Sequence, residues 1–111
     1  MNRSPGYAQE KLSEAVFLLA TGQSHVRERL REAFMAFHPV KEQDFPDDLR
    51  EKWRWIESQL KKYGPIMNGE SVVEGSVEHT LRRIRNSTGQ RIAQAIVELE
   101  YDLRTHKVLR D

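Results

Sequence analysis

Apolar residues recur every three or four positions along most of this chain, which is the period of an α-helix. This spacing predicts helices over residues 5–21, 24–37, 46–63, 76–85 and 87–105. Residues 86–90 either separate the last two helices or kink one long helix. No alternating pattern is long enough to predict a strand. The sequence therefore predicts an all-α fold of four to five helices, bundle-like, with the fifth helix near the centre.

Short local signals mark the ends of these helices. Ser4 is a favourable N-cap, and Gly22 ends the first helix in the usual way. The short link after Gly22 predicts that the first two helices form an antiparallel hairpin. Ser87, followed three residues later by Gln90, matches the capping-box pattern. We therefore expect the fifth helix to begin there.

Residues 64–75 form the longest stretch without helical spacing, and they contain three glycines and one proline. We expect a long loop here. A loop of this length in a compact domain is functional, packed by its own side chains, or mobile. Val72 and Val73 leave open a short extended piece or an early helical turn.

The two tryptophans of the chain, Trp53 and Trp55, are separated by one arginine. At 100° per residue they lie about 200° apart on a helix. Leu49, Ile56 and Leu60 share the side of Trp53, which predicts that Trp53 is a core residue. Trp55 then falls among charged residues and must find contacts elsewhere.

Other apolar residues also lie outside the main helical stripes, and two explanations remain open. In the first, residues of the 64–75 loop fold across Trp55. In the second, these side chains form a protein interface, where aromatic residues and methionine are enriched. The candidate interface consists of Trp55, Ile66, Met67, Val72, Val73, Ala93, Val97 and Tyr101.

Composition narrows the class of protein. A length of 111 residues suits one domain, with residues 1–4 and 106–111 expected to fray. The formal net charge of +1 gives no overall field that would attract nucleic acid or an anionic membrane. The absence of cysteine excludes disulfides and thiolate metal sites. With no apolar run long enough for a bilayer, we expect a soluble cytoplasmic protein without a membrane partner.

A cluster of arginines supports an alternative function, that of a nucleic-acid-associated regulator. Its members are Arg82, Arg83, Arg85 and Arg91, and they surround a segment that resembles a helix-turn-helix in outline. Most of the cluster precedes the turn, whereas base-reading side chains belong on the second helix. That helix offers Glu98 and Asp102 instead, and these carboxylates would repel phosphates.

Motifs for catalysis and metal binding are missing. Carboxylates recur at helical spacing, but no Glu-x-x-His accompanies them, and no two histidines are four residues apart. We therefore predict no cofactor and no metal. An enzyme or ligand binder using the long loop and His79 is the third alternative. The leading prediction is a small helical interaction or assembly module, with a protein partner or a second copy of itself.

Overall fold

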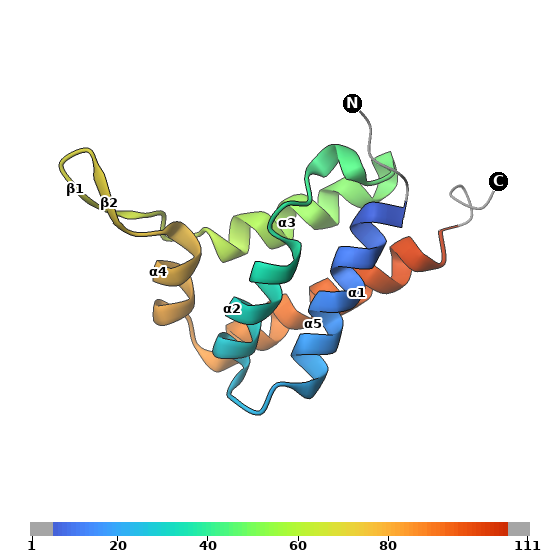
Figure 1. Ribbon diagram of the computed structural model, residues 1–111, viewed down its shortest axis with the longest axis horizontal. Helices are drawn as coiled ribbons and strands as arrows, with labels where there is room; N and C mark the ends of the chain where they lie inside the picture. Colours follow the sequence, from blue (N-terminus) through green and yellow to red (C-terminus); the bar gives the residue numbers. More distant parts are fainter. Residues whose placement is uncertain (1–5, 107–111) are drawn as a thin grey trace.

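The computed structural model describes residues 6–106, which form five α-helices and one two-stranded sheet (Figure 1). The predicted predominance of helix is confirmed. The elements in chain order are α1 (Gly6–Thr21), α2 (Val26–Phe37), α3 (Arg50–Leu60), β1 (Ile66–Asn68), β2 (Ser71–Glu74), α4 (Ser76–Arg83) and α5 (Asn86–Arg104). Two short 3₁₀ turns, Glu42–Asp44 and Asp47–Leu49, connect α2 to α3.

Some predictions concern residues outside the described range. The cap at Ser4, the helix start at Pro5 and the fraying of residues 1–4 all fall there. Of residues 106–111, the structure describes His106 alone, and its Nε2 lies 2.9 Å from Asp48 Oδ1. This contact joins the end of α5 to the turn that precedes α3.

The core lies between α5 and the helices that it contacts, α1, α2 and α3. Figure 1 shows α1 and α2 side by side and running in opposite directions. Trp53 on α3 is 3% exposed, and its ring centroid lies 5.6 Å from Phe37 and 5.0 Å from Phe45. Ile92 and Ile96 of α5 are fully buried. The opposite side of α5 faces solvent, because these three helices cover only part of its circumference.

A close approach and a side-chain bridge fix the start of α5 against α2. A Cβ atom at Gly89 would lie 3.2 Å from Val26 Cγ1, so the α5 backbone packs closely against the side chain of Val26 on α2. Arg27 on α2 donates to the carbonyl of Ile84 at 3.3 Å and to Asn86 Oδ1 at 3.1 Å. Together these contacts hold the junction between α4 and α5.

Several helix ends differ from the prediction. The N-cap of α2 is His25, whose Nδ1 accepts from the backbone N–H of Glu28 at 3.4 Å. Pro46 precedes a 3₁₀ turn, and the regular helix begins only at Arg50. The predicted capping box at Ser87 is wrong, because α5 already begins at Asn86. Its N-cap is Arg85, whose side chain cannot accept a hydrogen bond.

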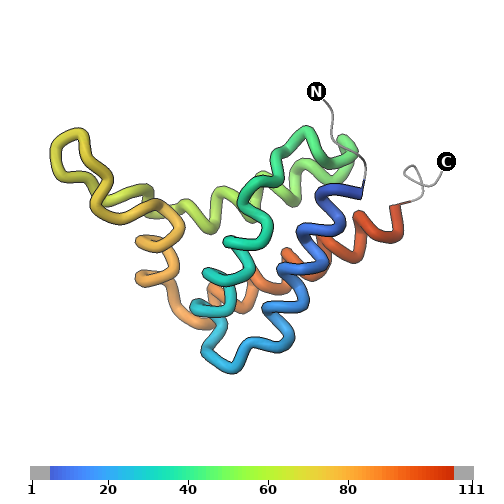
Figure 2. Tube along the Cα trace, viewed as in Figure 1, coloured from blue at the N-terminus to red at the C-terminus, as the bar shows by residue number. Residues whose placement is uncertain are grey.

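Residues 64–75 are not a loop throughout, because they contain a β-hairpin, and the short extended piece left open at Val72 and Val73 is part of β2. Met67 pairs with Val72 and Asn68 with Ser71. Gly69 has φ +63°, which suits glycine in a tight two-residue turn. The tube in Figure 2 shows the hairpin projecting from the helices. No helix within residues 6–106 combines the length and apolarity needed to cross a membrane.

Candidate functional site

A hollow beside α5 contains Trp55, and we call it the Trp55 groove. It has a volume of about 730 Å³ and is open to solvent. One wall comes from α3 and the preceding turn, and the other comes from α5. The lining residues are Asp48, Glu51, Lys52, Trp55, Arg91, Gln94, Ala95 and Glu98.

The helical spacing of α3 explains why Trp55 lies in this groove. Because two helical positions differ by about 200°, the burial of Trp53 directs Trp55 to the opposite side. Trp53 is 3% exposed and Trp55 is 42% exposed. The predicted division of the two rings between core and surface is therefore confirmed.

Ion pairs join the two walls of the groove. Lys52 Nζ donates to Glu98 Oε1 at 3.1 Å and lies 3.7 Å from Asp102 Oδ2. Gln94 Nε2 donates to Glu98 Oε2 at 3.1 Å. The hydrogen bond from Gln94, together with the hydrogen bond and charge of Lys52, lowers the pKa of Glu98 below its ordinary value. Glu98 is therefore a carboxylate at neutral pH.

Two charged residues of the groove lack such partners. Within residues 6–106, neither Arg91 nor Glu51 forms an ion pair or a side-chain hydrogen bond, and both are exposed. The groove thus combines a half-exposed indole ring, a fixed carboxylate at Glu98 and an unpaired guanidinium. Such a set can contact an apolar surface and bind an opposite charge at the same time.

The other candidate interface residues of α5 divide between surface and core. Val97 is 43% exposed and Tyr101 is 56% exposed. Ala93 is buried, at 6% exposure, and it lies at the base of a hollow between α5 and α1. A smaller hollow of about 400 Å³ separates α5 from α1 and includes Gln94 and Val97.

The candidate residues of the hairpin lie elsewhere. Ile66, Met67, Val72 and Val73 belong to β1 and β2, and none of them lines the Trp55 groove. Val72 and Val73 remain 61% and 66% exposed. Residues 64–75 therefore do not cover Trp55. The hairpin pairs with itself, which leaves its apolar side chains and the indole ring in separate places.

The arginine cluster is also divided. Arg82 donates to both carboxylate oxygens of Glu74, at 2.7 and 3.3 Å. The guanidinium of Arg83 lies 4.2 Å from the ring centroid of Tyr63. Arg85 is exposed at the start of α5, whereas Arg91 belongs to the Trp55 groove. Internal contacts thus engage two of the four predicted phosphate-binding residues.

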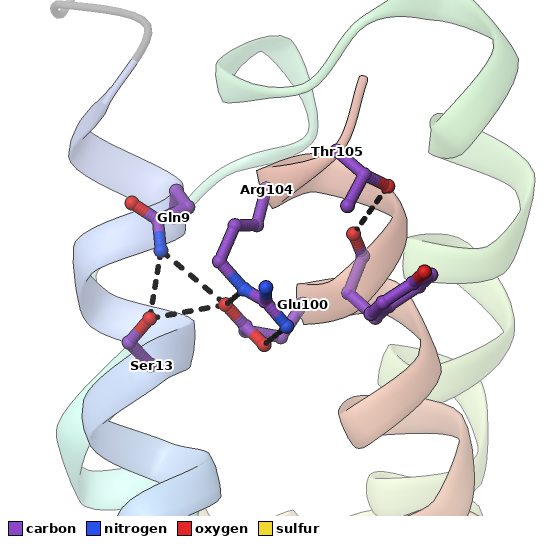
Figure 3. Close-up of polar contacts among 6 residues, drawn as sticks. Gln9, Ser13, Glu100, Arg104 and Thr105 are labelled. Atoms are coloured by element: carbon purple, nitrogen blue, oxygen red, sulfur yellow. Dashed lines mark hydrogen bonds and ion pairs between the residues drawn. The ribbon is translucent and has the colours of Figure 1, made fainter.

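A buried polar cluster between α1 and α5 was missed by the sequence reasoning (Figure 3). Glu100 is 6% exposed and accepts from Ser13 at 3.1 Å, Gln9 at 3.3 Å and Arg104 Nε at 2.9 Å. Burial raises the pKa of Glu100, but these donors outweigh it and the pKa lies below its ordinary value. The spacing of Glu100 and Arg104, four residues apart on a helix, was the available signal.

The histidines have structural contacts. His25 and His38 cap the two ends of α2. His79 lies with Nδ1 2.9 Å from the carbonyl oxygen of Gly64, which joins α4 to the segment before the hairpin. Within the part of the chain that the structure describes, no three His, Asp or Glu residues are grouped closely enough to hold a metal ion.

Comparison with protein-family models, curated proteins and solved structures finds no match to this chain. Its function must therefore be argued from its own surface. The Trp55 groove and the adjoining exposed side of α5 combine aromatic, apolar and charged groups, and they form the candidate functional site.

Proposed function

We propose that this chain is a small helical assembly module that self-associates through the Trp55 groove and the exposed side of α5. The single observation that carries the proposal is the exposure of Trp55 at 42%, beside a helix whose Val97 and Tyr101 are also exposed. Other apolar residues form the buried core, and none of these three side chains belongs to it. They are therefore available to a second molecule.

The composition of this surface supports the proposal. Tryptophan, tyrosine and arginine are the residues that most often dominate binding energy at protein interfaces. Trp55, Tyr101 and Arg91 lie on neighbouring parts of α3 and α5. At about 25 cal/mol per Å², covering the exposed part of one such ring contributes roughly 2 kcal/mol. Two rings on each partner would offset much of the cost of association.

Two further parts of the proposal follow from the sequence. In a bundle-like domain, α5 would act as the common scaffold, with one side in the core and the other side in the assembly. We also propose a reducing compartment such as the cytoplasm, because the chain lacks cysteine.

The nucleic-acid alternative has less support. Glu98 and Asp102 lie on or beside the exposed side of α5, and both contact Lys52. These carboxylates would repel a phosphate backbone, and Arg82 is already paired with Glu74. A positively charged surface that could follow nucleic acid is therefore interrupted.

The proposal is tested by replacing Trp55 with alanine and measuring molar mass by sedimentation equilibrium over a wide concentration range. We expect the molar mass of the unaltered chain to rise with concentration. Trp55→Ala should weaken association by about tenfold or more, as expected for an aromatic interface residue. Its free energy of unfolding should fall by only about 1 kcal/mol, since the ring is partly exposed.

Met35→Ala is the matched control, because Met35 is 65% exposed on α2 and does not line the Trp55 groove. This variant should associate like the unaltered chain. A chain that stays monomeric up to its solubility limit, with Trp55→Ala changing only thermal stability, would contradict the proposed function.

A further inference from the structure

We propose that two copies of this chain pair through α5 in antiparallel orientation, so that each α5 lies along the Trp55 groove of the other copy. This inference rests on the proposed self-association and specifies its geometry. Three features of α5 support it: the spacing of its exposed residues, the hollows on either side, and the placement of two opposite charges.

The first feature is a stripe on the exposed side of α5. Gln90, Gln94, Val97 and Tyr101 are all exposed, and they follow one another at intervals of four, three and four residues. This is the spacing with which one helix packs along another in a coiled coil. At 100° per residue the four side chains lie within an arc of about 60°. We call these residues the α5 seam.

The second feature is the space beside the seam. The Trp55 groove opens on one side, and the smaller hollow against α1 opens on the other. Gln94 lines both hollows, so the seam forms a ridge between them. Helices pack by inserting ridges into grooves. A second α5 ridge can therefore enter the Trp55 groove while the first ridge enters the partner's groove, as a two-fold interface requires.

The third feature is the charge beside the seam. Arg91 follows Gln90, and Glu98 follows Val97, so the two charges are seven residues apart on the same side. If Gln94 packs against Val97 of a second copy in antiparallel orientation, Arg91 of each copy faces Glu98 of the other. Flanking charges of this kind set the orientation of paired helices. In a parallel pair, Arg91 would instead face Asn86, and Glu98 would face Ala93.

The state of these two residues in the single chain agrees with such a pairing. Arg91 forms no ion pair within residues 6–106. The side chain of Glu98 is 48% exposed, although it accepts from Lys52 and Gln94. A carboxylate has about four acceptor positions, so a guanidinium from a second copy can be added. The surface is thus complementary to itself, which identifies a second copy of this chain as the occupant.

The experiment uses charge reversal in two separate chains. Arg91→Glu carries two acids beside the seam, and Glu98→Arg carries two bases. Each variant alone should self-associate about tenfold or more weakly than the unaltered chain, because like charges then meet twice across the pair. An equimolar mixture should form heterodimers with nearly the original affinity, since both contacts again join opposite charges. Native mass spectrometry with one isotope-labelled chain measures the heterodimer directly.

Controls separate this effect from damage to the fold. Glu98→Arg also removes the contact with Lys52, so Glu98→Gln serves as a matched variant that loses the charge without reversing it. A mixture of Glu98→Gln with Arg91→Glu has one attractive contact and one neutral contact, so its association should recover only in part and remain weaker than that of the mixture with Glu98→Arg. Circular dichroism of each variant should match that of the unaltered chain.

Because the chain has no cysteine, engineered cysteines give a second measurement of orientation. Under oxidation, a Gln94→Cys chain mixed with a Val97→Cys chain should form mainly the mixed disulfide. Mainly homodimeric disulfides of Gln94→Cys would indicate a parallel pair and overturn the inference.

Failure of the inference and failure of the proposed function can be distinguished. If the unaltered chain self-associates and Trp55→Ala weakens this, but the mixture of charge variants does not recover association, the antiparallel α5 pairing is overturned while the assembly function stands. If the unaltered chain is monomeric at every concentration, the proposed function is overturned, and the inference falls with it.

Discussion

Glu100 is nearly enclosed between α1 and α5, where a lone carboxylate would favour its neutral form. The ionised side chain of Glu100 is stabilised there because Arg104, Ser13 and Gln9 all donate hydrogen bonds to it. The sequence indicated only the Glu100–Arg104 pair, through its four-residue spacing, since the α1 partners are 87 and 91 residues away along the chain. By contrast, the different surroundings of Trp53 and Trp55 follow from helical spacing alone, so they could be predicted.

Replacement of Glu100 by glutamine should lower the free energy of unfolding by about 1–3 kcal/mol at neutral pH, because charge-assisted hydrogen bonds are lost. The folded-state pKa of Glu100 is lowered below the ordinary value of 4.5. Its contribution to stability is therefore fully present above that value and is lost as the pH falls through the folded pKa. Urea unfolding over a series of pH values should show the difference between the two proteins narrowing in acid.

Glu10→Gln is the control for this experiment, because Glu10 is an exposed carboxylate on α1, the helix that carries Gln9 and Ser13. It should change stability by less than about 0.5 kcal/mol. An equal effect of both substitutions, or a difference for Glu100→Gln that does not change with pH, would show that the buried carboxylate is not stabilising.

At the scale of elements, predictions succeeded where the signal is local and periodic. Burial of one side repeats over several turns in each long helix, and this repetition shows in the sequence. The hairpin was missed because its strands have only three and four residues, and most of their side chains are exposed. Without a buried side, no alternation of apolar and polar residues appears. Gly69 was the usable signal, because Gly69 and Glu70 form the turn and glycine at the first turn position is typical of a two-residue hairpin.

The start of α5 shows that a capping-box pattern in the sequence does not always mark the beginning of a helix. Ser87 and Gln90 have capping-box spacing, yet the helix begins before them, and Arg85 occupies the N-cap without a side-chain hydrogen bond. Packing of Ile84 into the core fixes this start, because Ile84 is 6% exposed and has an extended backbone. Tertiary contacts therefore determined the helix end, and the local signal was not used.

The missing cap leads to a prediction of increased stability. Arg85→Asp supplies a side-chain acceptor for the free N–H groups of the first turn and places negative charge at the positive helix end. We expect the free energy of unfolding to rise by about 1 kcal/mol, measured by thermal or urea unfolding. Arg85→Ala is the control, because it removes the positive charge without adding an acceptor. If alanine gives the same increase as aspartate, capping is not the cause.

At the scale of the whole molecule, two groups of exposed apolar side chains within residues 6–106 lie apart from each other, and Phe17 and Met35 are exposed elsewhere on α1 and α2. Trp55, Val97 and Tyr101 belong to α3 and α5, whereas Met67, Val72 and Val73 belong to the projecting hairpin (Figure 2). The sequence indicated both groups but could not show that they are apart, because their relative position depends on packing between distant segments. The sequence also could not reveal the Trp55 groove, since its walls come from residues separated by more than 35 positions.

Because the hairpin lies apart from the helices' buried core, we predict that the chain folds without it. No residue of β1 or β2 belongs to the buried core. Replacement of residues 67–73 by a short Gly/Ser linker can join Ile66 to Glu74, which are already paired neighbours. The helical circular dichroism signal should persist, with stability changed by about 1 kcal/mol or less. Self-association, measured by sedimentation, should also persist.

A double variant, Val72→Ser with Val73→Ser, is the control that keeps the hairpin backbone and removes apolar surface. It should behave like the linker variant. Loss of self-association in both proteins, with helical content intact, would assign the assembly surface to the hairpin rather than to α5.

The division of the two indole rings also gives the chain a pair of intrinsic optical reporters. Trp53 is enclosed by aromatic rings, so its fluorescence changes when the interior comes apart. Trp55 is in contact with water at 42% exposure, so its emission shifts to shorter wavelength when something covers it. A chain with Trp53 replaced by phenylalanine would thus signal contact at the groove without any attached dye.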